Sequence, residues 1–451
     1  MTTFISLHNL MSSGRVSSHP VSHNAEHVIC WQEFSNKVTL LAHGLKLRPE
    51  SRWLLISNDT LDFSIQLLAL IYAGKQVVIP PNTQAGTLAQ LAGEFDAIVS
   101  DALASLESST PPLAPIDPQA AIIDLYTSGS TGQPKRVRKT LAQFEAEIEV
   151  LEALWGGALA DSAIVATVPH HHIYGLIFRI LWPLSAGRLF DTVTCAHPDI
   201  LKQRMAQFNK SILVSSPAQL SRLPELTALS TLMTSTDFIF SSGGPLSLSA
   251  ATEYQQQIGC DPIEIFGSTE SGGIAWRKQC VNDAWEPFPG VVVKRNDAGA
   301  MLLMSPFLAD MAVLPMDDAI DILADGKFTL LGRLDRIVKV EEKRLSLPEM
   351  ESLLITHPWV TAAAATVLSG RRQRVGMLVE LSADGIQQLE RHGRRHVRQQ
   401  LKLHLGQRFE AVLLPKQWRF VEQMPMNAQG KLPCAIISAF FTSEESLHAK
   451  S

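Results

Sequence analysis

Short apolar segments alternate with amphipathic segments along most of the chain. Residues 162–169, 210–217 and 237–244 read "SAIVATVP", "KSILVSSP" and "DFIFSSGG", and each segment is apolar over the length of a strand. Stretches with helical patterning separate them. Strands that alternate with helices are typical of layered α/β proteins. The pattern therefore predicts an α/β fold.

The C-terminal part of the chain reads as a separate, smaller unit. Residues 359–368 and 374–381 ("WVTAAAATVL" and "RVGMLVEL") predict strands, and residues 394–409 predict a helix. The charge changes in the same region: from residue 334 onward the chain carries 17 Lys and Arg against 12 Asp and Glu, a net charge of +5, whereas the preceding part carries −10. We therefore predict a large N-terminal α/β domain that ends at Arg333 and a small α+β domain over residues 334–451.

Composition narrows the class of protein. The chain of 451 residues is 46% hydrophobic and 18% charged, which allows large cores, and its net charge of −5 gives no reason to expect nucleic-acid binding. The five cysteines are far apart, without a CxxC pair that would suggest zinc, and their odd number argues against a disulfide framework. The first residues do not resemble a signal peptide, and no apolar run approaches about 20 residues. We expect a cytoplasmic protein without a membrane span.

The loop "YTSGSTGQPK", Tyr126 to Lys135, is rich in groups that bind anions. Five of its ten residues carry hydroxyls, two are glycine, and it lies between the apolar run 120–124 and a second strand-like segment, residues 135–140. Glycines allow backbone amides to turn toward an anion, hydroxyls donate hydrogen bonds, and Lys135 adds positive charge. A helix begins only at Thr140, where "TLAQ" has the capping-box pattern. The loop therefore differs from the G-x-x-x-x-G-K-[ST] type, and we predict a phosphate-binding flap between two strands rather than a Ser/Gly surface turn.

This loop resembles the signature phosphate loop of the adenylate-forming superfamily, which includes acyl- and aryl-CoA synthetases, peptide-synthetase adenylation domains and luciferases. Further segments resemble the other motifs of the superfamily in the same order. They are "PHHHIYG", "FSSGGPLS", "EIFGSTES", "DDAIDILADGKFTLLGRLDRIVKVEEKRLSLPEME" and "MPMNAQGKLP". The resemblance covers the chain from about residue 30 to 435.

The resemblance implies a ligase reaction. A carboxylic acid and ATP would give an acyl-adenylate and pyrophosphate, and the acyl group would pass to the thiol of coenzyme A or of a carrier protein's phosphopantetheine. With only 125 residues ahead of the phosphate loop, the chain is similar to compact synthetases of bacterial aryl-polyene pigment clusters. That similarity implies an aromatic acid such as 4-hydroxybenzoate and an acidic acyl carrier protein as partner. A non-catalytic adenylate-binding sensor and a luciferase-like oxygenase remain open as alternatives.

The resemblance also implies roles for individual residues. Lys431, Thr269 and His172 would be catalytic. Lys431 suits this role because a lysine is a compact charge that reaches both the α-phosphate and the carboxylate. Glu270 would bind Mg²⁺, which prefers hard oxygen ligands. The residues expected to contact ATP share the motifs above and are Thr127, Ser128, Gly129, Ser130, Thr131, Gly132, Lys135, Gly243, Gly244, Glu264, Phe266, Gly267, Ser268, Asp318 and Arg333. Among these, Asp318 would accept the ribose hydroxyls and Phe266 would offer a flat face to adenine.

The resemblance further implies a mobile C-terminal domain with a hinge near Asp335. Lys431 would face the active site in the first step, and residues 339–344 would face it in the second. Glu342 occupies the position where the family usually has a glycine that lines the thiol tunnel, so the second step and its thiol stay open here.

Two clusters of like residues carry competing interpretations. The "HHH" of residues 170–172 suggests a metal, but adjacent side chains of an extended segment cannot all point at one ion, so zinc is disfavoured. The basic run from Arg391 to Lys402 is either the solvated face of a helix or a docking surface for an acidic carrier protein or the phosphates of coenzyme A.

Overall fold

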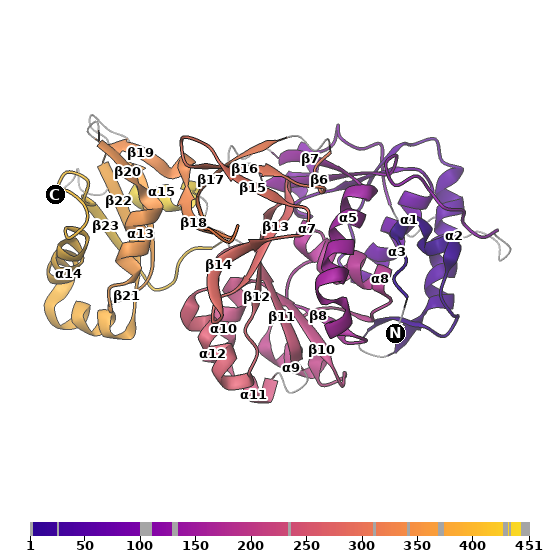
Figure 1. The fold of residues 1–451 in the computed structure, drawn as a ribbon, viewed down its shortest axis with the longest axis horizontal. Coiled ribbons are helices and arrows are strands. Elements are labelled where there is room, and N and C mark those ends of the chain that lie inside the picture. Colours follow the sequence, from indigo (N-terminus) through magenta and orange to yellow (C-terminus); the bar gives the residue numbers. More distant parts are fainter. Residues whose placement is uncertain are drawn as a thin grey trace. The chain divides into compact units, whose positions relative to one another are not determined.

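The chain divides into two compact units. The computed structural model describes residues 3–24, 27–99, 111–128, 134–232, 236–309, 313–340, 343–368, 374–426, 432 and 434–442 (Figure 1). Unit 1 comprises Met1–Val292 and Met304–Leu314, and unit 2 comprises Val293–Leu303 and Pro315–Ser451. The predicted domain boundary after Arg333 lies within unit 2. Both units mix helices and strands, and the predicted α/β class, with a large N-terminal and a smaller C-terminal part, is confirmed.

A mainly parallel sheet forms the centre of unit 1. Its strands, in spatial order, are β14 (Asn282–Pro287), β13 (Gly272–Lys278), β12 (Ile263–Ser268), β11 (Thr236–Ser242), β10 (Ser211–Ser215), β8 (Ala163–Ala166), β9 (Phe190–Thr194), β1 (Pro20–His23) and β2 (Val28–Cys30). The pairs from β12 to β9 run parallel, whereas β13 and β14 run antiparallel to their neighbours. The predicted strands at residues 162–169, 210–217 and 237–244 are confirmed as β8, β10 and β11.

A second sheet of unit 1 carries the two ends of the phosphate loop. Its spatial order is β5 (Ala97–Ile98), β3 (Arg52–Leu54), β4 (Gln76–Ile79), β6 (Ile122–Ser128) and β7 (Pro134–Thr140). β7 pairs antiparallel with β6 from Ile122–Thr140 to Ser128–Pro134. The prediction that the loop joins two strands is confirmed, although β6 extends through Ser128 because its pairing with β7 continues to that point.

Helices cover these sheets. In unit 1 they are α1 (Leu7–Ser13), α2 (Trp31–Lys46), α3 (Thr60–Tyr72), α4 (Ala85–Gln90), α5 (Leu141–Leu151), α6 (Gly157–Leu159), α7 (Ile173–Gly175), α8 (Trp182–Ala186), α9 (Pro198–Met205), α10 (Pro217–Leu226), α11 (Leu229–Leu232) and α12 (Leu248–Ile258), with π-helical turns η2 (Glu152–Gly156) and η3 (Leu176–Leu181). Figure 1 shows α2 and α3 packed side by side.

Helix α5 begins where the sequence predicts. The Gln143 side chain accepts a hydrogen bond from the Thr140 amide at 2.8 Å, which satisfies a backbone donor at the start of the helix. The predicted apolar face is buried and comprises Leu141, Phe144, Ile148 and Leu151. This packing fixes β7 and α5 as one rigid support.

Unit 2 contains small, mostly antiparallel sheets, in which β22 and β23 pair in parallel, and three helices among its described residues. One part has the strand order β15 (Val292–Arg295), β16 (Ala300–Met304), β17 (Leu314–Ile322) and β18 (Phe328–Arg333), followed by the 3₁₀ turn η4 (Leu334–Arg336) and the pair β19 (Ile337–Val340) and β20 (Lys343–Ser346). The last part comprises α13 (Leu347–Ile355), β21 (Val360–Leu368), β22 (Arg374–Leu381), α14 (Ala383–Leu405), β23 (Gln417–Val421) and α15 (Cys434–Thr442).

The predicted strands at residues 359–368 and 374–381 are confirmed as β21 and β22. The helix predicted at residues 394–409 overlaps α14, which begins earlier, ends at Leu405 and is interrupted at Gly393, where φ is +75°. In the part of the chain that the structure describes, no helix is both long enough and apolar enough to span a bilayer.

Candidate active site

The β6–β7 ladder positions the two ends of the phosphate loop. Thr127 lies opposite Lys135 in this ladder, and the Thr127 hydroxyl donates to the Lys135 carbonyl at 3.5 Å. Lys135 is exposed and directs its ammonium group away from the ladder toward Glu270. Gly129, Ser130, Thr131 and Gly132 lie outside the described residues, as does the side chain of Ser128. Their predicted contacts with ATP therefore stay predictions.

Lys135 and Glu270 meet although 135 residues separate them in the chain. The Lys135 ammonium donates to Glu270 Oε1 at 2.8 Å, and the side chains are 62% and 38% exposed. Burial disfavours the charged form of Glu270, but the hydrogen bond from Lys135 and local hydrogen bonds outweigh it, so the pKa of Glu270 lies below its ordinary value. An exposed ion pair contributes at most about 1 kcal/mol, so phosphate oxygens or a cation can replace either partner.

Glu270 lies on the tight turn between β12 and β13. Ser271 Oγ accepts from the Ser268 amide at 2.9 Å, and Ser268 Oγ accepts from the Ser271 amide at 3.1 Å. Gly272 has a φ of +71°, a conformation that glycine adopts without strain. Thr269 is half-buried within this turn. The reciprocal bonds hold the turn closed, and Thr269 and Glu270 lie at its tip.

Phe266 precedes this turn on β12 and packs against an aromatic neighbour. Its ring centroid lies 5.5 Å from that of Trp285, and the Arg277 guanidinium lies 4.4 Å from the Trp285 centroid on β14. Phe266 is half-buried, and Gly267 after it is exposed. Any side chain at Gly267 would collide with the carbonyl of Gly272, so glycine here permits the close approach of β12 and β13.

Glu264, whose predicted contact with ATP stays a prediction, is surrounded by protein donors. Its carboxylate is buried and accepts hydrogen bonds from the Arg277 guanidinium at 2.8 Å, the Gln279 amide at 2.6 Å and the Leu246 backbone at 2.9 Å. The last bond ties Glu264 to the loop that contains Gly243 and Gly244, which are exposed. Gly243 has a φ of +99°. Glu264 thus holds this loop in place.

The three adjacent histidines have different surroundings. His170 is buried, with Nε2 2.8 Å from the Ser57 carbonyl and Nδ1 3.1 Å from the Thr60 hydroxyl. Burial lowers the pKa of His170 to about 3, so the ring is neutral. Its Nε2 donates to the Ser57 carbonyl, and its Nδ1 lies beside the Thr60 hydroxyl, which donates to the Thr192 carbonyl at 2.8 Å. His172 is half-buried at the start of α7, with its ring centroid 4.3 Å from that of His171. No group of three or more His, Cys, Asp or Glu within the described ranges could hold a metal.

Asp318 and Arg333 lie in unit 2. They are opposite each other in the β17–β18 ladder, and the Arg333 guanidinium lies 3.4 Å from the carboxylate of Asp317. Asp317 is exposed and Asp318 is half-buried, since neighbouring residues of a strand face opposite sides. Gly332 has a φ of +113° beside Pro348. Lys431 and Glu342 lie outside the described residues.

An aromatic cluster lies between the π-helical turns and the central sheet of unit 1. Ring centroids are 4.9 Å apart for Tyr174 and Phe178, 5.1 Å for Phe178 and Phe240, 5.1 Å for Phe240 and Trp155, and 5.7 Å for Trp155 and Trp276. Tyr174 follows directly from the His172 motif. Tyr174 lies within the "PHHHIYG" motif and Phe240 begins "FSSGGPLS", whereas Trp155 is distant from every motif.

Two charged residues that sequence reasoning missed lie behind the Glu270 turn. Lys139 on β7 and Glu147 on α5 are both buried, at 2% and 4% exposure. Glu147 follows Phe144 by three residues and precedes Leu151 by four, so it borders the apolar face of α5. The signal in the sequence that could have revealed Glu147 was a charged residue next to the apolar face of a helix.

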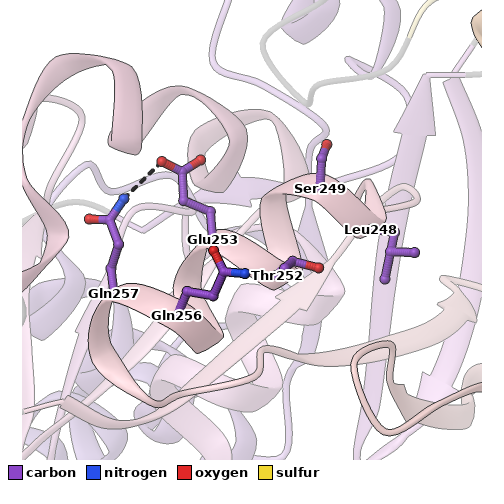
Figure 2. Close-up of a pocket in the computed structure, with 6 residues that line it drawn as sticks. All are labelled: Leu248, Ser249, Thr252, Glu253, Gln256 and Gln257. Carbon is purple, nitrogen blue, oxygen red and sulfur yellow. Dashed lines mark hydrogen bonds between the residues drawn. The ribbon is translucent and has the colours of Figure 1, made fainter.

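A surface pocket of about 600 Å³ lies elsewhere, along α12. It is lined by Leu248, Ser249, Thr252, Glu253, Gln256 and Gln257, where Gln257 donates to Glu253 at 2.8 Å (Figure 2). The lining comes from one helix and is mostly polar. It contains none of the predicted site residues, so we place the candidate active site at the Lys135–Glu270 pair.

Comparisons with known proteins identify the family of this chain. The AMP-binding enzyme family matches residues 81–299, and the AMP-binding enzyme C-terminal domain matches residues 349–431. The chain is 24% identical over 309 residues to a 4-coumarate–CoA ligase from Cereibacter sphaeroides, covering 68% of this chain and 69% of the relative. It is 23% identical over 374 residues to an acetyl-coenzyme A synthetase from Thiobacillus denitrificans, covering 71% and 56%.

Solved structures share the fold. MatB from Rhodopseudomonas palustris bound to ATP superposes with a TM-score of 0.79 at 17% identity, covering 98% of this chain and 99% of MatB. A benzoate CoA ligase from Burkholderia xenovorans superposes with a TM-score of 0.77 at 18% identity, covering 94% and 97%. With both family domains matched in order and the phosphate loop between paired strands, the chain belongs to the adenylate-forming superfamily of AMP-binding enzymes.

Proposed function

We propose that this chain is an acid–thiol ligase that activates an aromatic carboxylic acid with ATP and transfers the acyl group to a phosphopantetheine thiol. The observation that carries the proposal is the Lys135–Glu270 pair, which joins the end of the phosphate loop to the β12–β13 turn at 2.8 Å. This arrangement suits a metal-bound triphosphate, because the Lys135 ammonium can bind phosphate oxygens and the Glu270 carboxylate can bind the metal ion.

The first step of the proposed reaction forms an acyl-adenylate. A carboxylate oxygen of the acid attacks the α-phosphorus of ATP, the bond from that phosphorus to the bridging oxygen breaks, and pyrophosphate leaves. Negative charge accumulates on the α-phosphate, so preorganised donors lower the barrier. Lys431 and Lys135 supply positive charge in this proposal, and Thr269 and His172 contact the reacting groups.

The residues present fit magnesium. Mg²⁺ is usually held by one or two carboxylates together with waters and phosphate oxygens. A single carboxylate that is 38% exposed, Glu270, matches this need at the end of the phosphate loop. When bound there, the ion would neutralise phosphate charge. Glu270 would hold it, and Lys135 would be released from its ion pair to bind phosphate oxygens.

The aromatic cluster supports an aromatic acid with a polar substituent. The Trp276 indole N–H is buried and makes no hydrogen bond to the described residues. The Tyr174 hydroxyl is also buried, and the backbone of Ser215 interacts with it. Leaving a buried donor unpaired costs about 1–3 kcal/mol. A ring with a hydroxyl group, such as 4-hydroxybenzoate, would pack against the aromatic side chains and satisfy a donor.

The second step transfers the acyl group. The thiol sulfur attacks the acyl carbon, the bond to AMP breaks, AMP leaves, and the thiol proton passes to solvent. Both coenzyme A and carrier proteins present this thiol. We favour an acidic carrier protein, because Arg391, Arg394, Arg395 and Arg398 are exposed along α14 of unit 2, where opposite charge would speed encounter.

ATP–pyrophosphate exchange across a panel of benzoic, cinnamic and fatty acids tests the proposal. We expect exchange that needs Mg²⁺ and is fastest with a hydroxylated aromatic acid. Lys431→Ala and Glu270→Gln should each lower the exchange rate about 10²–10³-fold, the usual loss for one preorganised transition-state contact. Lys416→Ala, an exposed lysine in unit 2, is the matched control and should keep the wild-type rate.

Two outcomes contradict the proposal in different ways. Wild-type exchange by Lys431→Ala would show that Lys431 is not the catalytic lysine. ATP binding without exchange for any acid would favour the adenylate-binding sensor over the ligase.

A further inference from the structure

Lys135 and Lys139 both contact Glu270, Lys135 through the carboxylate and Lys139 through the backbone carbonyl. The two lysines are four residues apart on β7, so their side chains leave the same face of the strand. Lys135 binds the Glu270 carboxylate, whereas the buried Lys139 ammonium donates to the Glu270 backbone carbonyl at 3.2 Å and to the Phe307 carbonyl at 3.2 Å. Lys139 therefore fixes the backbone of the residue whose side chain Lys135 holds.

Glu147 fixes the next part of the same turn. Its Oε1 accepts from the Gly273 amide at 2.9 Å. A Cβ placed on Gly272 would lie 2.6 Å from Glu147 Oε2, and one on Gly273 would lie 3.0 Å from Oε1. The carboxylate thus packs directly against the backbone of both glycines, with no space for a side chain between them.

The two buried charges support each other. Burial raises the pKa of Glu147 to about 7 and lowers the pKa of Lys139, and each residue partly offsets this by stabilising the charged form of the other. A buried charge without a counter-charge and hydrogen bonds is costly. Lys139 and Glu147 form hydrogen bonds with the backbone of Glu270 and Gly273. These bonds stabilise the two buried side chains and hold the backbone of the turn in place.

We propose that Lys139 and Glu147 are positioning residues that act together through the backbone of the Glu270 turn and set where the Glu270 carboxylate meets Mg²⁺. We call this pair the buried clasp. The inference rests on the proposed function, in which Glu270 holds the ion. The clasp touches neither metal nor substrate, and its effect reaches the site only through the fixed backbone.

Metal dependence separates positioning from a purely structural role. Outer-shell partners of a metal ligand typically change metal affinity or activity by about 10–100-fold when mutated. We therefore expect Glu147→Gln and Lys139→Met to raise the Mg²⁺ concentration that half-saturates pyrophosphate exchange about tenfold, with a smaller change in the rate at saturating Mg²⁺. A structural role would instead lower the amount of active protein and leave the half-saturating concentration unchanged.

The matched control lies on the same helix. Glu145 is buried two residues from Glu147, but its carboxylate binds the His8 ring at 2.9 Å and faces away from the Glu270 turn. Glu145→Gln makes the same chemical change and should leave the Mg²⁺ dependence at the wild-type value. An equal shift in both variants would overturn the proposal.

The double variant Lys139→Met/Glu147→Gln tests whether the two residues act as one unit. Residues of one network give non-additive effects, so the double variant should be no worse than the worse single variant. If the two shifts in half-saturating Mg²⁺ multiply, the residues act independently and the clasp is refuted.

A second measurement does not need turnover. The rise in melting temperature with ATP plus Mg²⁺ is compared with the rise with ATP plus EDTA. We expect the metal-dependent increment to shrink in Glu147→Gln and Lys139→Met and to persist in Glu145→Gln. Wild-type increments in all variants would overturn the proposal. An inactive wild type that still shows the increment would refute the ligase function while leaving the clasp testable.

Discussion

Protonation of His170 should destabilise the folded chain in a defined pH range. The ring is 3% exposed, its Nε2 donates to the Ser57 carbonyl, and its Nδ1 lies 3.1 Å from the Thr60 hydroxyl, which donates to the Thr192 carbonyl. The Thr192 carbonyl near Thr60 already accepts from the buried Arg179 guanidinium at 2.9 Å. A second proton on His170 would place a positive charge on a buried ring, where water cannot solvate it, and near the Arg179 cation.

The size of the effect follows from the two pKa values of His170. The pKa is 6.5 in the unfolded chain and about 3 in the folded one, so between these values the unfolded state binds more protons. Stability is then fully present above pH 6.5 and is lost as the pH falls toward 3. At about pH 5 the loss relative to pH 8 is 1.5 pKa units, or about 2 kcal/mol.

Urea unfolding followed by tryptophan fluorescence measures this loss. His170→Gln keeps a donor for Ser57 and removes the titration, so the free-energy difference between wild type and variant should change by about 2 kcal/mol from pH 8 to pH 5. His197→Gln, at an exposed histidine, is the control and should follow the wild type. If His170→Gln and wild type lose stability in parallel, the ring is not a buried neutral group.

Three further predictions concern the reaction. Asp335→Pro fixes the backbone at the predicted hinge and should slow thioester formation from a supplied acyl-adenylate more than pyrophosphate exchange; equal damage to both steps would remove the case for a hinge there. Reversing Arg394 and Arg395 to glutamate should slow carrier loading several-fold without changing adenylation. Raising salt from about 0.05 to 0.3 M should have the same effect on the wild type. A loading rate that stays the same under both changes would rule out docking on α14. Tyr174→Phe should lower kcat/KM for a hydroxylated aromatic acid by about 5–10-fold, as expected for one lost hydrogen bond, and leave the unsubstituted acid unaffected; equal effects on both acids would place Tyr174 away from the substituent.

The sequence predicted the strands and the helix that carry the site better than the contacts among the site residues. The strands around the phosphate loop and the start of α5 were predictable because apolar periodicity and the "TLAQ" capping pattern are local signals. The Lys135–Glu270 pair required the family resemblance, since 135 residues separate its members. No local sequence pattern distinguishes Glu264, which is buried beside Arg277, from Glu270, which lies six residues later and is half-exposed.

Lys139 and Glu147 show why the remainder was missed. A lysine in the segment "KRVRKT" and a glutamate beside an apolar helix face are normally solvated residues. Here both are buried: Lys139 lies against the carbonyls of Glu270 and Phe307, and Glu147 lies against the Gly273 amide. Tertiary packing overrides the usual preference of charged residues for water when hydrogen bonds and a counter-charge are present. Such cases are invisible to composition and periodicity.

The glycine pair of the β13 turn has a consequence for engineering substrate range. Gly272 combines a φ of +71° with a Cβ position occupied by Glu147, and a Cβ on Gly273 would meet the Phe288 ring at 2.6 Å. Libraries that diversify the walls of the acyl site should keep both positions as glycine, because most substitutions there would be lost as misfolded protein. Substitutions at Trp276, three residues further along the same strand, would vary substrate binding without that loss of folded protein.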